Sequence, residues 1–180
     1  KSTPMGSIDH PFNPLALCLG ADSTFVARTI DRDPKHLREM LKRSNDHKGT
    51  SLLEIYQNCN VFNDGAFFGM TDKQTKENQT LFLEHGQPLL FGENHDKGIV
   101  LDGLKPKVVS MDEYSKEDLW IHDETDQAKA GLLSRFFDND LPRPFGVLYC
   151  EQRECYEDAL HNQIDKSIEL KGEGNLDDLL

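Results

Sequence analysis

Several features that would place this chain in a specialised class of protein are scarce or missing. The 180 residues include only four cysteines, at positions 18, 59, 150 and 155, too few for a secreted disulfide scaffold of this length. No window approaches the ~20 consecutive apolar residues that a membrane-spanning helix needs, and no signal-peptide pattern opens the chain. We therefore expect a cytoplasmic protein that does not enter a membrane.

Basic residues are also in short supply. Lys and Arg number 20 against 32 Asp and Glu, which gives a net charge of −12. So acidic a surface repels phosphates, and this argues against nucleic acid or an anionic membrane as a partner. The length fits one ordinary domain or part of a larger one. The chain begins with polar Lys1-Ser2-Thr3 and has no initiator Met, which indicates a part of a longer protein.

The common nucleotide and hydrolase motifs are absent: there is no G-x-S-x-G, G-x-x-x-x-G-K-[ST] or G-x-G-x-x-G segment. Cys150, Cys155 and His161 have a spacing that zinc ligands can show, but a fourth ligand is missing, so ordinary reduced cysteines are the better interpretation. The segment 122–124 (His-Asp-Glu) distantly resembles a zinc deaminase motif, but the cysteine spacing that follows is wrong. Asp123 or Asp126 is better explained as a helix N-cap.

The first part of the chain has a strand–helix–strand pattern. An Asn-Pro pair at 13–14 and an Asp-Pro pair at 33–34 are typical of a helix N-cap and first turn. Helices are expected over 14–19 and from 34 to near 49, and strands over 24–30 and 51–56. This order implies a right-handed crossover and a parallel sheet, and the carboxyl edge of such a sheet is where α/β folds place their sites.

The remaining elements are less regular. Residues 60–80 are expected to form a long irregular segment with one apolar group at 66–70, and Phe67 and Phe68 are expected in the core or at a subunit interface. Beyond it, the pattern predicts a hairpin from 89–92 and 99–101, a strand over 107–111, a helix over 126–137, a strand over 145–150 and an amphipathic helix over 156–170. Residues 171–180 are expected to form a mobile acidic tail.

One helix face is basic. The predicted helix from residue 34 carries Lys35, His36, Arg38, Lys42 and Arg43 on its outer side. Such a face is either simply solvated or a docking patch for an acidic partner.

Cys59 stands out because of its position. It follows the second predicted parallel strand, between Asn58 and Asn60, at the edge where a site is expected. A lone cysteine is normally a small buried apolar residue, and the alternative is a metal ligand. One thiolate cannot hold a metal cluster, so a cluster at this position would need its other ligands from elsewhere.

A family resemblance extends over almost the whole chain up to the tail. The segments that carry it are KSTPMG (1–6), NPLAL (13–17), GA (20–21), FVAR (25–28), DPKHL (33–37), EIYQNCNVFNDGAF (54–67), EHGQPL (84–89), HDE (122–124) and PFGVL (144–148). Together they resemble the β subunit of 2-oxoacid:ferredoxin oxidoreductases. The segment around Cys59 most resembles the branch that acts on 2-oxoglutarate.

The resemblance implies a fold, a reaction and a set of cofactors. It implies an α/β fold, the C-terminal half of a doubly wound thiamine-diphosphate-binding domain with a C-terminal extension. The family converts a 2-oxo acid and coenzyme A to an acyl-CoA, using thiamine diphosphate, Mg²⁺ and a 4Fe–4S cluster that passes electrons to ferredoxin. The implied partners are an α subunit of the same enzyme, ferredoxin, the 2-oxo acid and CoA. Cys59 resembles the fourth cluster cysteine, which is remote in sequence from the other three.

The chain also departs from the family pattern. The G-D-G segment that holds Mg²⁺ and diphosphate has no counterpart here, and Cys18, Cys150 and Cys155 lie outside the cluster motif. Both sets of residues are expected upstream of Lys1, so the isolated chain is expected to be inactive. We expect residues 1–80 to belong to the thiamine-diphosphate domain, 81–170 to the extension and 171–180 to the tail. A pyruvate or other 2-oxoacid enzyme and a non-catalytic α/β interaction domain remain as alternatives.

Overall fold

The fold is described from a computed structural model, which covers Met5, residues 8–136 and residues 141–179. Its elements are α1 (Pro14–Gly20), β1 (Phe25–Ile30), α2 (Pro34–Asp46), β2 (Ser51–Tyr56), α3 (Phe68–Thr71), α4 (Lys76–Gln79), β3 (Thr80–Phe82), β4 (Leu90–Phe91), β5 (Lys97–Asp102), β6 (Lys105–Ser110), η1 (Lys116–Asp118), α5 (Gln127–Leu133), β7 (Arg143–Cys150), α6 (Tyr156–Lys171) and η2 (Leu176–Leu179). Lys1–Pro4 and Gly6 of the family-like N-terminal segment, as well as Phe137, lie outside the described residues.

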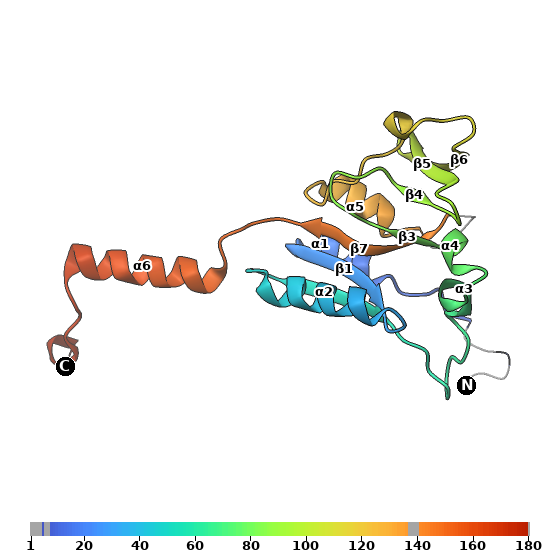
Figure 1. The fold of residues 1–180 in the computed structure, drawn as a ribbon. Helices are drawn as coiled ribbons and strands as arrows, with labels where there is room; N and C mark the ends of the chain where they lie inside the picture. The colour runs from blue at the N-terminus through green and yellow to red at the C-terminus, as the bar shows by residue number, and fades with distance from the viewer. Residues whose placement is uncertain (1–4, 6–7, 137–140, 180) are drawn as a thin grey trace.

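A four-stranded sheet in the order β2-β1-β7-β3 forms the centre of the molecule (Figure 1). β1 and β2 are parallel, as the strand–helix–strand pattern predicted. β7 comes from the far end of the chain, lies antiparallel to β1 and is parallel to β3. The fold is therefore α/β with a mixed central sheet, to which residues on both sides of position 80 contribute strands. The division into segments 1–80, 81–170 and 171–180 stays a prediction.

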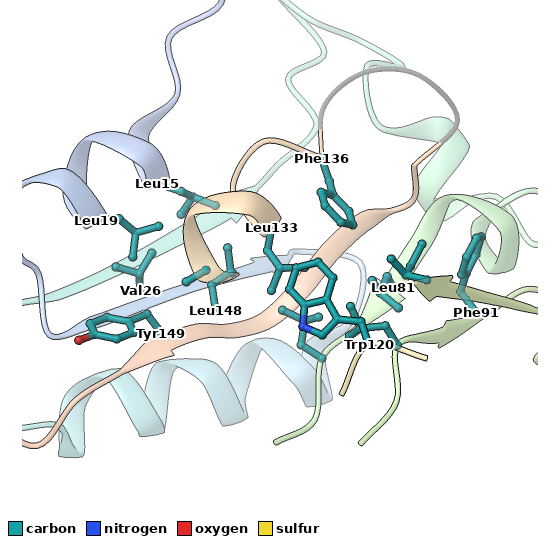
Figure 2. Packing of buried hydrophobic residues seen from close by; sticks show 14 residues of the cluster. Leu15, Leu19, Val26, Leu81, Phe91, Trp120, Leu133, Phe136, Leu148 and Tyr149 are labelled. Atoms are coloured by element: carbon teal, nitrogen blue, oxygen red, sulfur yellow. The ribbon is translucent and has the colours of Figure 1, made fainter. Parts of the chain in front are cut away.

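Helices cover both faces of this sheet. α2 lies on one face, while α1 and α5 lie on the other (Figure 1). Because successive side chains of a strand point to opposite faces, Val26 packs with α1 and α5, while Phe25 and Ala27 pack with Met40 of α2. Figure 2 shows the larger of these two clusters, in which Leu133 of α5 lies over the sheet beside Trp120. Every residue of β1 is buried as a result.

The helix starts confirm the predicted caps. Asn13, Asp33 and Asp126 each accept a hydrogen bond from a backbone N–H in the first helical turn, at 3.0 Å. Asp123, the other N-cap candidate, instead accepts from Thr125. α5 ends at Leu133 rather than near 137 because the chain turns there and directs Phe136 into the core.

A second sheet, β4-β5-β6, is antiparallel and contains the predicted hairpin together with the strand expected over 107–111. The segment 60–80 is more regular than expected, because it includes the one-turn helices α3 and α4 and ends in β3.

The tail holds a one-turn helix at Leu176–Leu179; its mobility stays a prediction. Within the described residues no helix combines the length and apolar character needed to cross a membrane.

Candidate functional site

Cys59 lies where the parallel strand pair ends. β2 finishes at Tyr56, level with Ile30 at the end of β1, and the chain then turns so that Cys59 and Asn63 form an isolated bridge. The Asn63 N–H donates to the Cys59 carbonyl at 2.9 Å. Phe62 and Val61, inside this turn, are exposed. The turn is thus a short knuckle, here defined as residues 58–65, that presents one cysteine at the sheet edge.

The sulfur of Cys59 accepts hydrogen bonds within the knuckle. The Phe62 N–H lies 3.5 Å from Sγ. Backbone N–H groups, first that of Phe62 and then that of Val61, hold the pKa of the Cys59 thiol below its ordinary value, because they stabilise the thiolate. A thiolate is the form of cysteine that binds metal.

The side chain of Asn58 forms three hydrogen bonds within the knuckle. Its side-chain oxygen accepts from the Gly65 N–H at 2.9 Å. Its amide group donates to Asn60 Oδ1 at 2.7 Å and to Asp64 Oδ1 at 2.9 Å. Gly65 adopts a φ of +80°, which few other residues adopt without strain, and a Cβ there would lie 3.3 Å from Phe68. The contacts of Asn58 with Asn60, Asp64 and Gly65 therefore close a loop around Cys59.

Two aromatic side chains and an arginine pack together beside the knuckle. The Tyr56 ring stacks on Phe67 with centroids 4.5 Å apart. Arg28 of β1 lies over the same ring at 5.0 Å, and its Nε donates to Glu54 at 2.6 Å. Arg28 is buried. Phe67 is thus half-buried against Tyr56 and belongs to neither core cluster, and Phe68 is exposed. A subunit interface at these two residues stays a prediction.

The donor chemistry at Cys59 fits one ligand of an iron–sulfur cluster. Cys59 is half-buried, and its sulfur accepts backbone N–H bonds. Such a cysteine is suited to cluster ligation, because hydrogen bonds to sulfur stabilise the negative charge of a thiolate. The described residues hold no group of three or more His, Cys, Asp or Glu side chains that could bind a metal ion by themselves. Any cluster on Cys59 must therefore take its other ligands from elsewhere, as the sequence indicated.

The other chemistry-bearing residues gather at the opposite end of the sheet. Cys150 pairs with Phe25 at the start of β1, and burial raises the pKa of its thiol. Its N–H donates to the carbonyl of Glu124 at 2.7 Å. Cys155 donates to Asp158 at 3.2 Å. Cys150 is thus held by its backbone in the sheet, the Cys155 thiol is bonded to a carboxylate, and His161 lies on α6.

Two residues of the predicted basic face are not simply solvated. Arg43 forms a two-point ion pair with the buried Glu124, at 3.0 and 2.7 Å, and His36 is bonded to Thr29 Oγ1 at 2.8 Å. Assigning these two to the outer face was wrong, because His36 and Arg43 lie four residues before and three residues after the buried Met40, on the same face of α2. Lys35, Arg38 and Lys42 are exposed, as expected of a solvated face.

The structure also contains a cleft that no sequence motif indicated. It has a volume of about 490 Å³ and lies between β3, β4 and η1. Phe82, Leu90 and Ile121 provide apolar walls, and Glu77 and Glu117 provide charge. These residues come from five separate segments, so only the tertiary structure brings them together.

Comparison with known proteins places this geometry in context. No family model matches the chain. It is 39% identical over 167 residues to the 2-oxoglutarate oxidoreductase subunit KorB of Mycobacterium tuberculosis, covering 91% of this chain and 44% of that protein. It is 27% identical over 161 residues to the 2-oxoacid:ferredoxin oxidoreductase 2 subunit beta of Aeropyrum pernix, covering 89% of this chain and 42% of that protein. The chain thus spans under half the length of these curated relatives.

A solved structure shares the fold. The 2-oxoglutarate:ferredoxin oxidoreductase from Magnetococcus marinus, solved with 2-oxoglutarate, coenzyme A and succinyl-CoA bound, superposes with a TM-score of 0.59 at 20% identity. The match covers 98% of this chain and 45% of that one. The mixed α/β architecture therefore recurs as a unit inside a larger protein.

Proposed function

Because this chain belongs to the family of 2-oxoacid:ferredoxin oxidoreductase β subunits, we propose that it forms part of an enzyme that oxidises 2-oxoglutarate. In the proposed reaction the 2-oxo acid and CoA yield an acyl-CoA, CO₂ and a proton. The two electrons released leave one at a time through a 4Fe–4S cluster to ferredoxin. The chain's proposed place is the C-terminal half of the subunit.

The geometry of Cys59 carries the proposal. This cysteine is presented at the carboxyl edge of the parallel strands, and backbone N–H groups of its own knuckle hold it toward the thiolate. In a cluster with four cysteine ligands, a ligand distant in sequence closes the site. We assign that role to Cys59, with the other three cysteines outside this chain.

The remaining residues of the site position this ligand. Asn58 ties both ends of the knuckle together, and the Tyr56–Phe67 stack holds it on the sheet. Thiamine diphosphate with Mg²⁺ would supply the carbanion chemistry of decarboxylation, and the cluster would supply one-electron transfer. Residues outside this chain are proposed to bind thiamine diphosphate, and an α subunit is the proposed partner.

The choice of 2-oxoglutarate follows from the relatives. The mycobacterial relative is named a 2-oxoglutarate oxidoreductase subunit, and the protein with the matching fold was solved with 2-oxoglutarate bound. The Cys59 segment also resembles that branch most. Pyruvate or another 2-oxo acid is the alternative substrate.

The test is an anaerobic assay of the complete β subunit that contains this chain, coexpressed with its α subunit. We expect CoA-dependent reduction of ferredoxin with 2-oxoglutarate, and at least tenfold lower kcat/KM with pyruvate. A preference for pyruvate would assign the chain to the other branch of the family. Complete inactivity with every 2-oxo acid, in a preparation that binds thiamine diphosphate and the cluster, would contradict the proposed function and favour a non-catalytic interaction domain.

A further inference from the structure

The last long helix stands apart from the rest of the molecule. α6 extends away from the central sheet, at the left of Figure 1, and none of its sixteen residues is buried. Near its start, Asp158 pairs with Lys48 at 3.0 Å. Because most helices in proteins are stabilised by packing of an apolar face, a helix of this length without such packing is suited to bind something else.

α6 carries an apolar stripe on one face. Leu160, Ile164 and Ile168 recur at intervals of four residues, and their side chains are 36%, 45% and 42% exposed. Residues four apart lie on the same helix face. Asp158 is six positions from Ile164, which at 100° per residue places it about 120° away from the stripe. The pairing with Lys48 therefore leaves the stripe open.

The apolar residues of this stripe are placed symmetrically about Ile164, and the charged residues at its two ends have opposite signs. Leu160 and Ile168 lie four residues before and after it, and Glu157 and Lys171 lie seven residues before and after it. Seven residues are almost two full turns, so both charges are on the stripe face. One end of the stripe is thus acidic and the other basic, with apolar side chains between them.

We propose that α6 binds α6 of a second copy of this chain in an antiparallel pair centred on Ile164. In this register Leu160 faces Ile168 of the other copy, and Glu157 faces its Lys171, twice by symmetry. Tyr156 faces Gly172, which has no side chain to clash with it. A parallel pair would instead oppose Glu157 with Glu157 and Lys171 with Lys171, so the charges select the antiparallel arrangement.

The size of the surface determines how strong the pairing is. A helix of sixteen residues is about 24 Å long, so the paired surface is smaller than that of permanent dimers. The pair is therefore a reversible contact whose population depends on protein concentration. It does not depend on the proposed catalytic function.

Sedimentation equilibrium of the full chain, at concentrations from micromolar to millimolar, tests the proposal. We expect a monomer–dimer equilibrium that Ile164→Lys abolishes. Glu157→Lys and Lys171→Glu should each weaken dimerisation about tenfold, because two attractive contacts become repulsive. The double variant Glu157→Lys/Lys171→Glu should restore the original affinity. Glu169→Lys, with the same charge change on the opposite face of α6, is the matched control.

The charge-reversal series distinguishes the possible outcomes. Monomers at every concentration would overturn the proposal and leave the stripe to a different partner. Dimers that survive Ile164→Lys would show that another surface pairs. Dimers in which the double variant is no stronger than either single variant would rule out the antiparallel register. Circular dichroism of each variant confirms that α6 remains helical.

Discussion

Two cysteines lie near opposite ends of β1, on neighbouring segments, and the pKa values of their thiols are shifted in opposite directions. At the carboxyl end, the exposed Cys59 knuckle donates backbone N–H groups to sulfur, which lowers the thiol pKa. At the amino end, Cys150 packs beside Arg43 and Glu124, and burial raises its thiol pKa. The loop after β2 therefore presents one cysteine as a potential ligand, while β7 holds the other, half-buried, against the core.

The difference comes from what surrounds each sulfur. Burial disfavours a thiolate at Cys150, and the negative charge of Glu124 adds to this effect. Beside Cys59 the nearest groups are N–H donors from a turn that Asn58 holds closed. Proximity to a sheet edge is therefore insufficient to make a cysteine a ligand, because the local donors and charges determine whether the thiolate is favoured.

The largest stability effect is expected at the amino end. Arg43→Met removes the cation from Glu124, whose side chain is only 10% exposed, and leaves a buried carboxylate without its partner. We expect a loss of about 2 kcal/mol in the free energy of unfolding, less than the ~3–5 kcal/mol for a fully buried pair because Arg43 is partly exposed. Urea denaturation of the chain measures it.

Arg38→Met is the matched control for this effect. Arg38 is exposed on the same helix, so its replacement should change stability by less than about 0.5 kcal/mol. Equal costs for the two variants would show that the Arg43–Glu124 pair does not support the fold.

A smaller effect is expected at the carboxyl end. Asn58→Ala removes the acceptor for the Gly65 N–H and the donor for Asn60 and Asp64, and should cost about 1 kcal/mol in total because these bonds are close to solvent. Hydrogen exchange should become faster across residues 59–65 and stay unchanged in β1. Asn60→Ala, which loses one of the three bonds, should have a weaker effect; equal protection in all three proteins would contradict the role of Asn58.

Local elements could be predicted from the sequence because their causes are local. The caps at Asn13 and Asp33 and the parallel pair of β1 and β2 depend on residues near each other in the chain. The place of Cys59 at the edge of that pair followed from the same pattern.

Contacts between distant segments could not be predicted in this way. Glu124 meets Arg43 across 81 positions, and β7 enters the sheet beside β1 from the far end of the chain. Arg43 and His36 were wrongly placed on the outside of α2, because the buried face is centred on Met40, while Leu41 is 49% exposed. The N–H bonds to Cys59 depend on backbone angles that residue types alone do not specify.

The smallest effect is a pH dependence of stability. His122 is buried with Nε2 bonded to the Val147 carbonyl at 2.8 Å, and burial lowers its pKa in the folded state. The unfolded chain binds a proton with a pKa near 6.5, so it takes up more protons than the folded chain below that pH. Stability should therefore be complete above pH 7 and fall as the pH drops below about 6.5.

Urea denaturation between pH 7.5 and 5.5 measures this dependence. His122→Gln should flatten the curve, although its midpoint at pH 7.5 is also expected to fall. Substituting His161, which is exposed on α6, should leave the slope unchanged. A slope that survives His122→Gln would assign the dependence to another group, with His36 the next candidate because burial lowers its pKa as well.

The most direct test of the central claim compares the cysteines at the two ends of β1. Cys59→Ser and Cys150→Ser are prepared anaerobically in the complete β subunit with its α subunit, reduced, and examined by electron paramagnetic resonance beside an iron and sulfide count. We predict that Cys59→Ser loses iron or shifts the cluster signal while retaining thiamine diphosphate, because serine offers a harder and more basic ligand. Cys150→Ser should keep the wild-type signal. A wild-type cluster in Cys59→Ser, together with its loss in Cys150→Ser, would contradict the assignment of Cys59 as the cluster ligand.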